Sequence, residues 1–307
     1  MRISAVLLLL FVSLTPVFGE DAAPAAPDAR DVDFLRVDED EEAARLQTSV
    51  TRYEKDGVTV ELLGAVHIAD KEYYDELNRR FAAFDALLFE MIGGENLVNG
   101  KAPVPAEDEE PDLVMDMLGK MYDSMAKFLK LTGQKDGIDY AAKNFVHADL
   151  TVAEFVALQE ERGESLLGFA LAAGRQMEEN PDAEVRQPNM ARLLTAFLAG
   201  NANALKMEII HTLGQGDDQI SALAGENVII HDRNAKCLKV LDAEIAKGRK
   251  NLGIFYGAAH YPDMEERLLK QGWKRTGHEW LTAWDVPKPK RRPKALPGKQ
   301  APPKKAA

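Results

Sequence analysis

A short motif that contains a histidine and an aspartate occurs twice in the chain, as GAVHIAD at residues 64–70 and as GAAHYPD at residues 257–263. The two histidines are His67 and His260. An imidazole can accept or donate a proton near neutral pH, and it can bind a transition metal. Two histidines in matching contexts therefore point to one shared chemical site.

Each copy of the motif follows a predicted strand and precedes a predicted helix. The apolar runs at residues 58–63 and 252–256 have the length and composition of buried strands. Ligands bind beyond the carboxyl ends of parallel strands, and Gly64 and Gly257 would let a backbone approach closely there. The aspartate that ends each copy is interpreted as a helix N-cap or as a partner of the helix dipole.

A third predicted strand, at residues 86–89, is followed by Glu90. A carboxylate in a dry core is costly unless it is paired or bound. If the three strands are parallel, Glu90 converges with His67 and His260, and such a set suits one divalent ion, namely Zn, Mn or Co. The ion would activate water, and Glu90 is either its ligand or the base toward that water.

The order of these elements resembles the TraB/PrgY/GumN family, which is related to the Tiki proteins. The resemblance covers about residues 50–284, and it rests on residues 64–67, Glu90, Arg233 with Asn234, and residues 257–260. It implies an α/β fold like those of erythromycin esterase and the haem-associated ChaN proteins. The Tiki branch further implies metal-dependent proteolysis at the two histidines and the glutamate, whereas other members have no established chemistry.

Four further residues are candidates for the site. Arg233 would hold a substrate carboxylate or stabilise an oxyanion, and Asn234 would form a hydrogen bond beside it. Both lie in an amphipathic stretch that suits a helix packed on the sheet. His147 and Asp149 either supply a general base with its orienting carboxylate or only shape a turn.

The predicted architecture is one α/β domain at residues 46–286, with a mostly parallel central sheet flanked by helices. A helical subdomain inserted at about residues 112–215 would cover the strand ends. Residues 1–19 have the pattern of a secretory signal, which predicts an exported, periplasmic or extracellular protein without a stable membrane anchor after signal removal. Residues 20–45 are interpreted as a disordered acidic linker, and residues 287–307 as a basic disordered tail.

Charge and composition limit the partners. The chain of 307 residues has a net charge of −12 although its last 21 residues contain eight Lys or Arg and no acid, so the remainder is strongly acidic. An acidic body disfavours nucleic acid. A single cysteine, Cys237, excludes an internal disulfide. We expect a peptide or another small envelope substrate, and the apolar faces of the middle helices permit a homodimer.

Two functions of different classes follow from these features. The first is an exported metal-dependent hydrolase, which we interpret as a peptidase. Within the same class, a metal-free variant would use a histidine to activate water directly. The second is a non-catalytic protein that captures a peptide, haem or an envelope fragment under the helical subdomain. The sequence contains no HExxH, GxSxG or Walker motif, so the familiar zinc peptidase, serine hydrolase and nucleotide-binding classes lose support.

Overall fold

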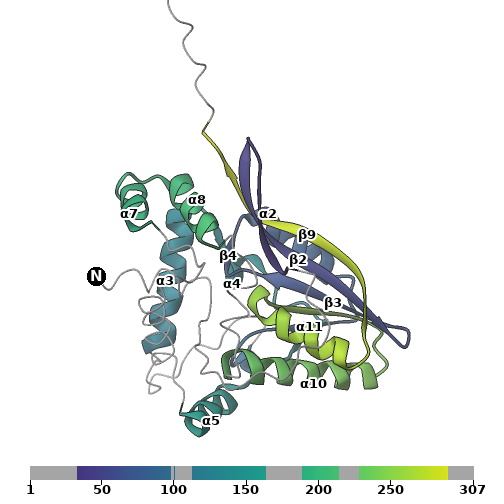
Figure 1. Cartoon of the computed structure of the whole chain (residues 1–307). Coiled ribbons are helices and arrows are strands. Elements are labelled where there is room, and N and C mark those ends of the chain that lie inside the picture. Colours follow the sequence, from purple (N-terminus) through teal and green to yellow (C-terminus); the bar gives the residue numbers. More distant parts are fainter. Residues whose placement is uncertain (1–32, 98–99, 101–112, 164–188, 214–227, 290–307) are drawn as a thin grey trace, which may run out of the picture.

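A seven-stranded mixed sheet is the framework of the protein (Figure 1). The computed structural model describes residues 33–97, 100, 113–163, 189–213 and 228–289. The strand order is β1-β2-β3-β8-β5-β7, and β9 also pairs with β2. The strands are β1 (Leu35–Glu39), β2 (Ala43–Lys55), β3 (Val58–Ala65), β5 (Ala86–Phe89), β7 (Phe145–His147), β8 (Asn251–Gly257) and β9 (Lys274–Pro287).

The parallel part of the sheet contains β3, β8, β5 and β7, whereas β1, β2, β3 and β9 are joined by antiparallel pairing. Helices follow the parallel strands, as expected for βα units. The predicted α/β class, with its mostly parallel sheet flanked by helices, is therefore confirmed. The α-helices are α2 (Lys71–Phe81), α3 (Leu113–Leu129), α4 (Gln134–Gly137), α5 (Val152–Arg162), α7 (Met190–Leu198), α8 (Ala202–Leu213), α10 (Arg233–Ala246) and α11 (Tyr261–Lys270).

Helices bury both faces of the central strands. Along β8, Ile254 packs in one buried cluster with Leu241 of α10 and Leu268 of α11, whereas Phe255 packs in another with Leu77 of α2. Adjacent residues of a strand point to opposite faces, so this division follows from the strand itself. Figure 1 shows α10 and α11 lying along the sheet. Burial on both faces explains why the central strands are almost continuously apolar.

The amino-terminal boundary of the domain differs from the prediction. Residues 35–39 form β1 and residues 43–45 begin β2, so the linker predicted over residues 20–45 is wrong from residue 35 onward. The acidic composition of residues 35–39 concealed strand β1. In the structure Leu35 is buried, and Asp38 and Asp40 pair with Arg45 of the neighbouring strand. Residues 20–32, the predicted signal and the tail beyond residue 289 lie outside the described residues.

The middle of the chain is largely helical, as predicted, and α3, α5, α7 and α8 lie between β5 and β8 in sequence. The predicted range of about 112–215 nevertheless includes β7, which joins the main sheet beside β5. A second, two-stranded antiparallel sheet also connects this region to the first motif, because β6 (Thr132–Gly133) pairs with β4 (Ile68–Ala69). In the part of the chain that the structure describes, no helix has the length and apolarity of a membrane span.

Gly64 of the first motif is required for close approach of β3 to β2. A Cβ at this position would lie 3.0 Å from the Cβ of Thr48 and 3.2 Å from the backbone oxygen of Ser49. Both neighbours are fixed by the sheet, so we expect Gly64→Ala to lower the free energy of unfolding by about 1–3 kcal/mol. Urea denaturation measures the change.

Gly277→Ala is the matched control, because an added Cβ in β9 would meet the Cβ of Arg52 at 3.5 Å, an ordinary contact. We expect this variant to unfold at nearly the wild-type urea concentration. Equal midpoints for the two variants would show that the motif glycine is not needed for strand packing.

Candidate functional site

Three parallel strands bring the predicted residues to one edge of the sheet. His67 follows β3, Glu90 follows β5, and His260 follows β8, which lies between the other two strands. In register, Ala65 pairs with Gly257 across β3 and β8, and Phe89 lies beside Phe255 across β5 and β8. The convergence that the sequence predicts thus arises from the strand order.

Glu90 is held by partners on both of its oxygens. Its Oε2 accepts a hydrogen bond of 2.6 Å from the backbone N–H of Gly257, and its Oε1 accepts one of 2.6 Å from Nη2 of Arg233. The Nε2 atom of His260 lies 3.5 Å from the same Oε1. Burial by itself raises the pKa of Glu90, but the charge of Arg233, followed by that of His260, outweighs burial and holds this pKa well below 4.5. Glu90 is therefore a carboxylate at neutral pH.

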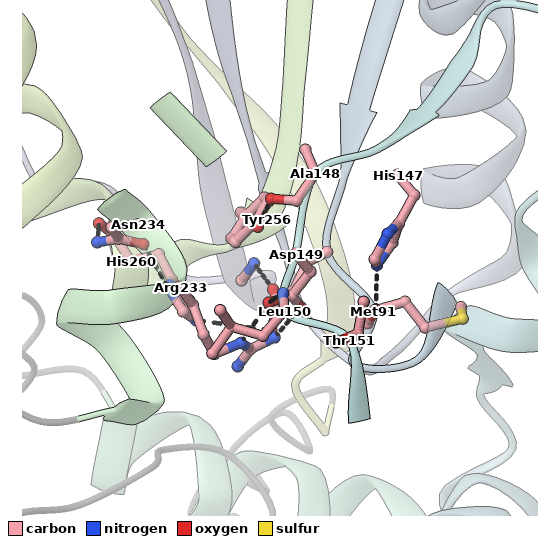
Figure 2. A network of polar contacts seen from close by, with 12 residues as sticks. Met91, His147, Ala148, Asp149, Leu150, Thr151, Arg233, Asn234, Tyr256 and His260 are labelled. Carbon is pink, nitrogen blue, oxygen red and sulfur yellow. Dashed lines mark hydrogen bonds and ion pairs between the residues drawn. The ribbon is translucent and has the colours of Figure 1, made fainter. Parts of the chain in front are cut away.

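Arg233 contacts two carboxylates, those of Asp149 and Glu90, and Figure 2 shows its contact with Asp149. Its Nε and Nη2 donate to Oδ1 and Oδ2 of Asp149 at 2.9 and 2.6 Å, while Nη2 also contacts Glu90. Burial lowers the pKa of Arg233, but Asp149 and Glu90 together raise it well above its usual value. The guanidinium thus neutralises two protein carboxylates, which differs from the predicted binding of a substrate carboxylate.

Asn234 fixes the orientation and the tautomer of His260. The Nδ2 of Asn234 donates to the backbone oxygen of His260 at 3.0 Å and to Oδ2 of Asp263 at 2.7 Å. Its Oδ1 therefore faces Nδ1 of His260, at 2.7 Å, and must accept the proton that Nδ1 carries. This leaves Nε2 of His260 directed toward Glu90.

A π-helical turn positions Arg233 and Asn234. The turn η2 (Val228–Asp232) runs directly into α10 at Arg233. Such turns contain one residue more than an α-helical turn and are frequent at functional sites. Because consecutive helix residues point about 100° apart, Arg233 reaches the carboxylates while Asn234 reaches His260.

The two motif aspartates lie at the starts of helices, as the sequence suggested, but neither side chain forms a capping hydrogen bond. Asp70 occupies the N-cap position of α2 without a capping hydrogen bond, and its Oδ2 accepts instead from the backbone N–H of Asp285 at 2.7 Å. Asp263 accepts from Asn234 and, at 2.7 Å, from Nε of Arg267. Asp263 thus supports the residue that holds His260.

His67 is the exposed histidine of the pair. Its backbone oxygen accepts a hydrogen bond of 2.8 Å from the N–H of Gln134, and its ring meets the ring of Tyr122 at 5.1 Å. The surrounding protein displaces water and lowers the pKa of His67, whereas the charge of Glu90 acts in the opposite direction. His67 therefore lies within the electrostatic field of the same site and is held in its neutral form.

The structure does not bring His147 and Asp149 together as a base and its orienting carboxylate. Nε2 of His147 lies 2.8 Å from the backbone oxygen of Met91, and Asp149 binds Arg233 instead (Figure 2). The strand ends at His147, so the two side chains are no longer related by strand geometry. Sequence reasoning also missed Tyr122, since a tyrosine in a helical stripe resembles any core residue.

The arrangement of these residues does not fit a three-ligand metal site. Among the described residues, no group of three His, Cys, Asp or Glu side chains is placed to share a metal ion. Glu90 already contacts the guanidinium of Arg233, and a second cation at the same oxygen would be repelled by it. His260 has one feature of a metal-binding histidine, because its Nδ1 donates to Oδ1 of Asn234 and Nε2 is left for other partners.

Comparison with known proteins finds no matching family model, no similar curated sequence and no similar solved structure. The resemblance to the TraB/PrgY/GumN family consequently stays a prediction.

Asp149 is fully buried, and its carboxylate matches the fork of Arg233. We expect Asp149→Asn to lower the free energy of unfolding by about 3 kcal/mol, because removal of one partner leaves a buried charge incompletely compensated. Chemical denaturation measures the loss. Asp75→Asn, which breaks the exposed ion pair with Lys71, serves as the control and should leave stability unchanged.

The lowered pKa of Glu90 predicts a defined loss of stability in acid. A depressed carboxylate pKa stabilises the folded state in full above the unfolded pKa of 4.5, and this contribution is lost as the pH falls from there through the folded pKa. We expect the stability advantage of wild type over Glu90→Gln to be constant above pH 4.5 and to shrink below it. Unfolding curves at a series of pH values test this, and an advantage that persists at the lowest pH contradicts it.

Proposed function

We propose that the protein is a hydrolase that uses His260 as the general base toward water. The observation that carries this proposal is the Nδ1 contact of His260 with Asn234, which places the proton on Nδ1 and leaves Nε2 as the basic atom. A positioned imidazole of fixed tautomer is the usual group for removing a proton from water at neutral pH.

Glu90 and Arg233 supply the electrostatics of the proposed reaction. When Nε2 of His260 accepts a proton from water, the imidazolium that forms lies 3.5 Å from Oε1 of Glu90, which is ionised. The carboxylate stabilises that cation, and Arg233 prevents Glu90 from taking the proton itself. The water oxygen then bonds to the substrate carbonyl carbon, and the imidazolium returns its proton to the leaving nitrogen or oxygen as that bond breaks.

His67 has a different role in this proposal. His67 is exposed as a residue, and its lowered pKa keeps its ring neutral at neutral pH, so the ring can offer an N–H to a substrate in exchange for its contact with the Gln134 side chain. A neutral imidazole can donate a hydrogen bond to the carbonyl oxygen as negative charge develops on it. The substrate class remains the one proposed from the sequence, a peptide or another small envelope compound, and export of the protein is likewise part of the proposal.

The test is hydrolysis of p-nitrophenyl acetate and of fluorogenic peptide amides by the purified protein. We expect His260→Ala to lower kcat/KM by about 10²–10⁴-fold, the usual contribution of a general base. His67→Ala should lower it by about 10²-fold, as for loss of one oxyanion donor. The control is His211→Ala, whose imidazole lies beside Glu39 on the edge strand β1, and which should retain wild-type activity.

Removal and restoration of metal ions distinguish this mechanism from the metal-dependent mechanism predicted from the sequence. Activity that survives dialysis against EDTA supports direct activation of water by His260. Activity that is lost and then restored by Zn, Mn or Co would instead support the metal-dependent hydrolase. Retention of peptide binding in His67→Ala, with no turnover by the wild type, would favour the capture protein.

A further inference from the structure

The helical insert contributes an aromatic ring directly beside the site. Tyr122 lies in α3, and its ring meets the ring of His67 edge to face, at 5.1 Å between centroids and 62° between planes. The contact joins a residue that follows β3 to a residue of α3 that lies more than 50 positions later in the chain. Figure 1 shows α3 beside β4, the short strand that follows His67.

A second observation also places Tyr122 at the site. Burial, and then the charge of Glu90, raise the pKa of the Tyr122 hydroxyl. Glu90 comes from β5 and His67 from the end of β3, so Tyr122 lies within reach of two strand ends that carry the proposed chemistry. The phenol stays neutral at all physiological pH values, and its ring offers an apolar surface.

The ring of Tyr122 is only partly buried, and the same helix continues its apolar face. Met125 is likewise half-buried against the core. Residues three apart on a helix are neighbours, so Met125 extends the surface of Tyr122 by one turn. The strand ends provide charged and polar groups, whereas α3 provides an apolar surface beside His67.

We propose that Tyr122 is a specificity-determining residue, whose ring packs against an apolar side chain of the substrate next to the scissile carbonyl. The inference rests on the proposed hydrolase function, which makes this carbonyl the one that is hydrolysed. A substrate carbonyl that accepts a hydrogen bond from His67 has its neighbouring side chain within contact distance of a ring that packs on His67. An apolar group gains from leaving water at that surface, and a glycine gains nothing.

Two labelled tripeptides test the proposal by equilibrium binding. They differ only in a central phenylalanine or glycine. The amide after that residue is replaced by a ketomethylene group, which keeps the carbonyl that His67 would contact and cannot be hydrolysed. Dissociation constants are measured by fluorescence anisotropy. We expect wild type and Tyr122→Phe to bind the phenylalanine peptide about tenfold more tightly than the glycine peptide, and Tyr122→Ala to bind the two equally.

Phe128→Ala is the matched control, because Phe128 is an aromatic residue of the same helix whose ring stacks on Phe197 at 4.8 Å. It should keep the tenfold preference. Circular dichroism checks that each variant is folded, and Tyr122→Leu replaces Tyr122→Ala if the alanine variant is not. With leucine, the expected result is a clearly reduced preference, and an unchanged preference counts against the proposal.

The outcomes separate this proposal from the proposed hydrolase. A preference that persists without Tyr122, or a wild type that binds neither peptide or both equally, overturns the role of Tyr122. Turnover of peptide amides without any such preference overturns the role of Tyr122 alone. If the protein hydrolyses no substrate but still prefers the phenylalanine peptide, and this preference depends on Tyr122, the result supports ligand selection by Tyr122 and contradicts the hydrolase proposal.

Discussion

The contact of Arg233 with Asp149 and Glu90 is the interaction on which the rest of the site depends. Two buried carboxylates near each other would repel, and one of them would be protonated if no cation lay between them. The guanidinium prevents this because its planar fork binds Asp149 in a bidentate manner and reaches Glu90 from the same nitrogen. It also joins α10 to the chain segments that follow β5 and β7. A compact ammonium group would not offer these directions, so lysine is a poor substitute.

Arg233 and Asn234 divide two tasks between consecutive positions of one helix. Arg233 sets the ionisation of Glu90, and Asn234 sets the tautomer of His260. Both depend on the place where η2 ends and α10 begins, since a shift of one residue would rotate both side chains by about 100°. The positions of Glu90 and His260 are thus held by the backbone geometry of this helix start, and Asp263 provides further support through Asn234.

One part of the site is built on the central strands, and another part faces the helical insert. His260 is buried and Glu90 is half-buried at the ends of central strands, and both are fixed by hydrogen bonds to protein groups. His67 is exposed and faces Tyr122 of the helical insert. A site built on strands gives precise positions for proton transfer, while an inserted helix can change its side chains without disturbing the sheet. This arrangement favours chemistry from the sheet and selectivity from α3.

The sequence by itself determined the α/β class, the strand that precedes each motif and the approach of His67, Glu90 and His260 to one edge. These follow from local rules, because apolar runs and turn residues specify strands, and parallel strands end on the same side. Only the tertiary structure decided the partners: Asp149 binds Arg233 and is not paired with His147. Strand β1 was likewise concealed by its acids. Pairings between distant residues depend on strand register and on side-chain direction, and the hydrophobic periodicity of the sequence reveals neither of them.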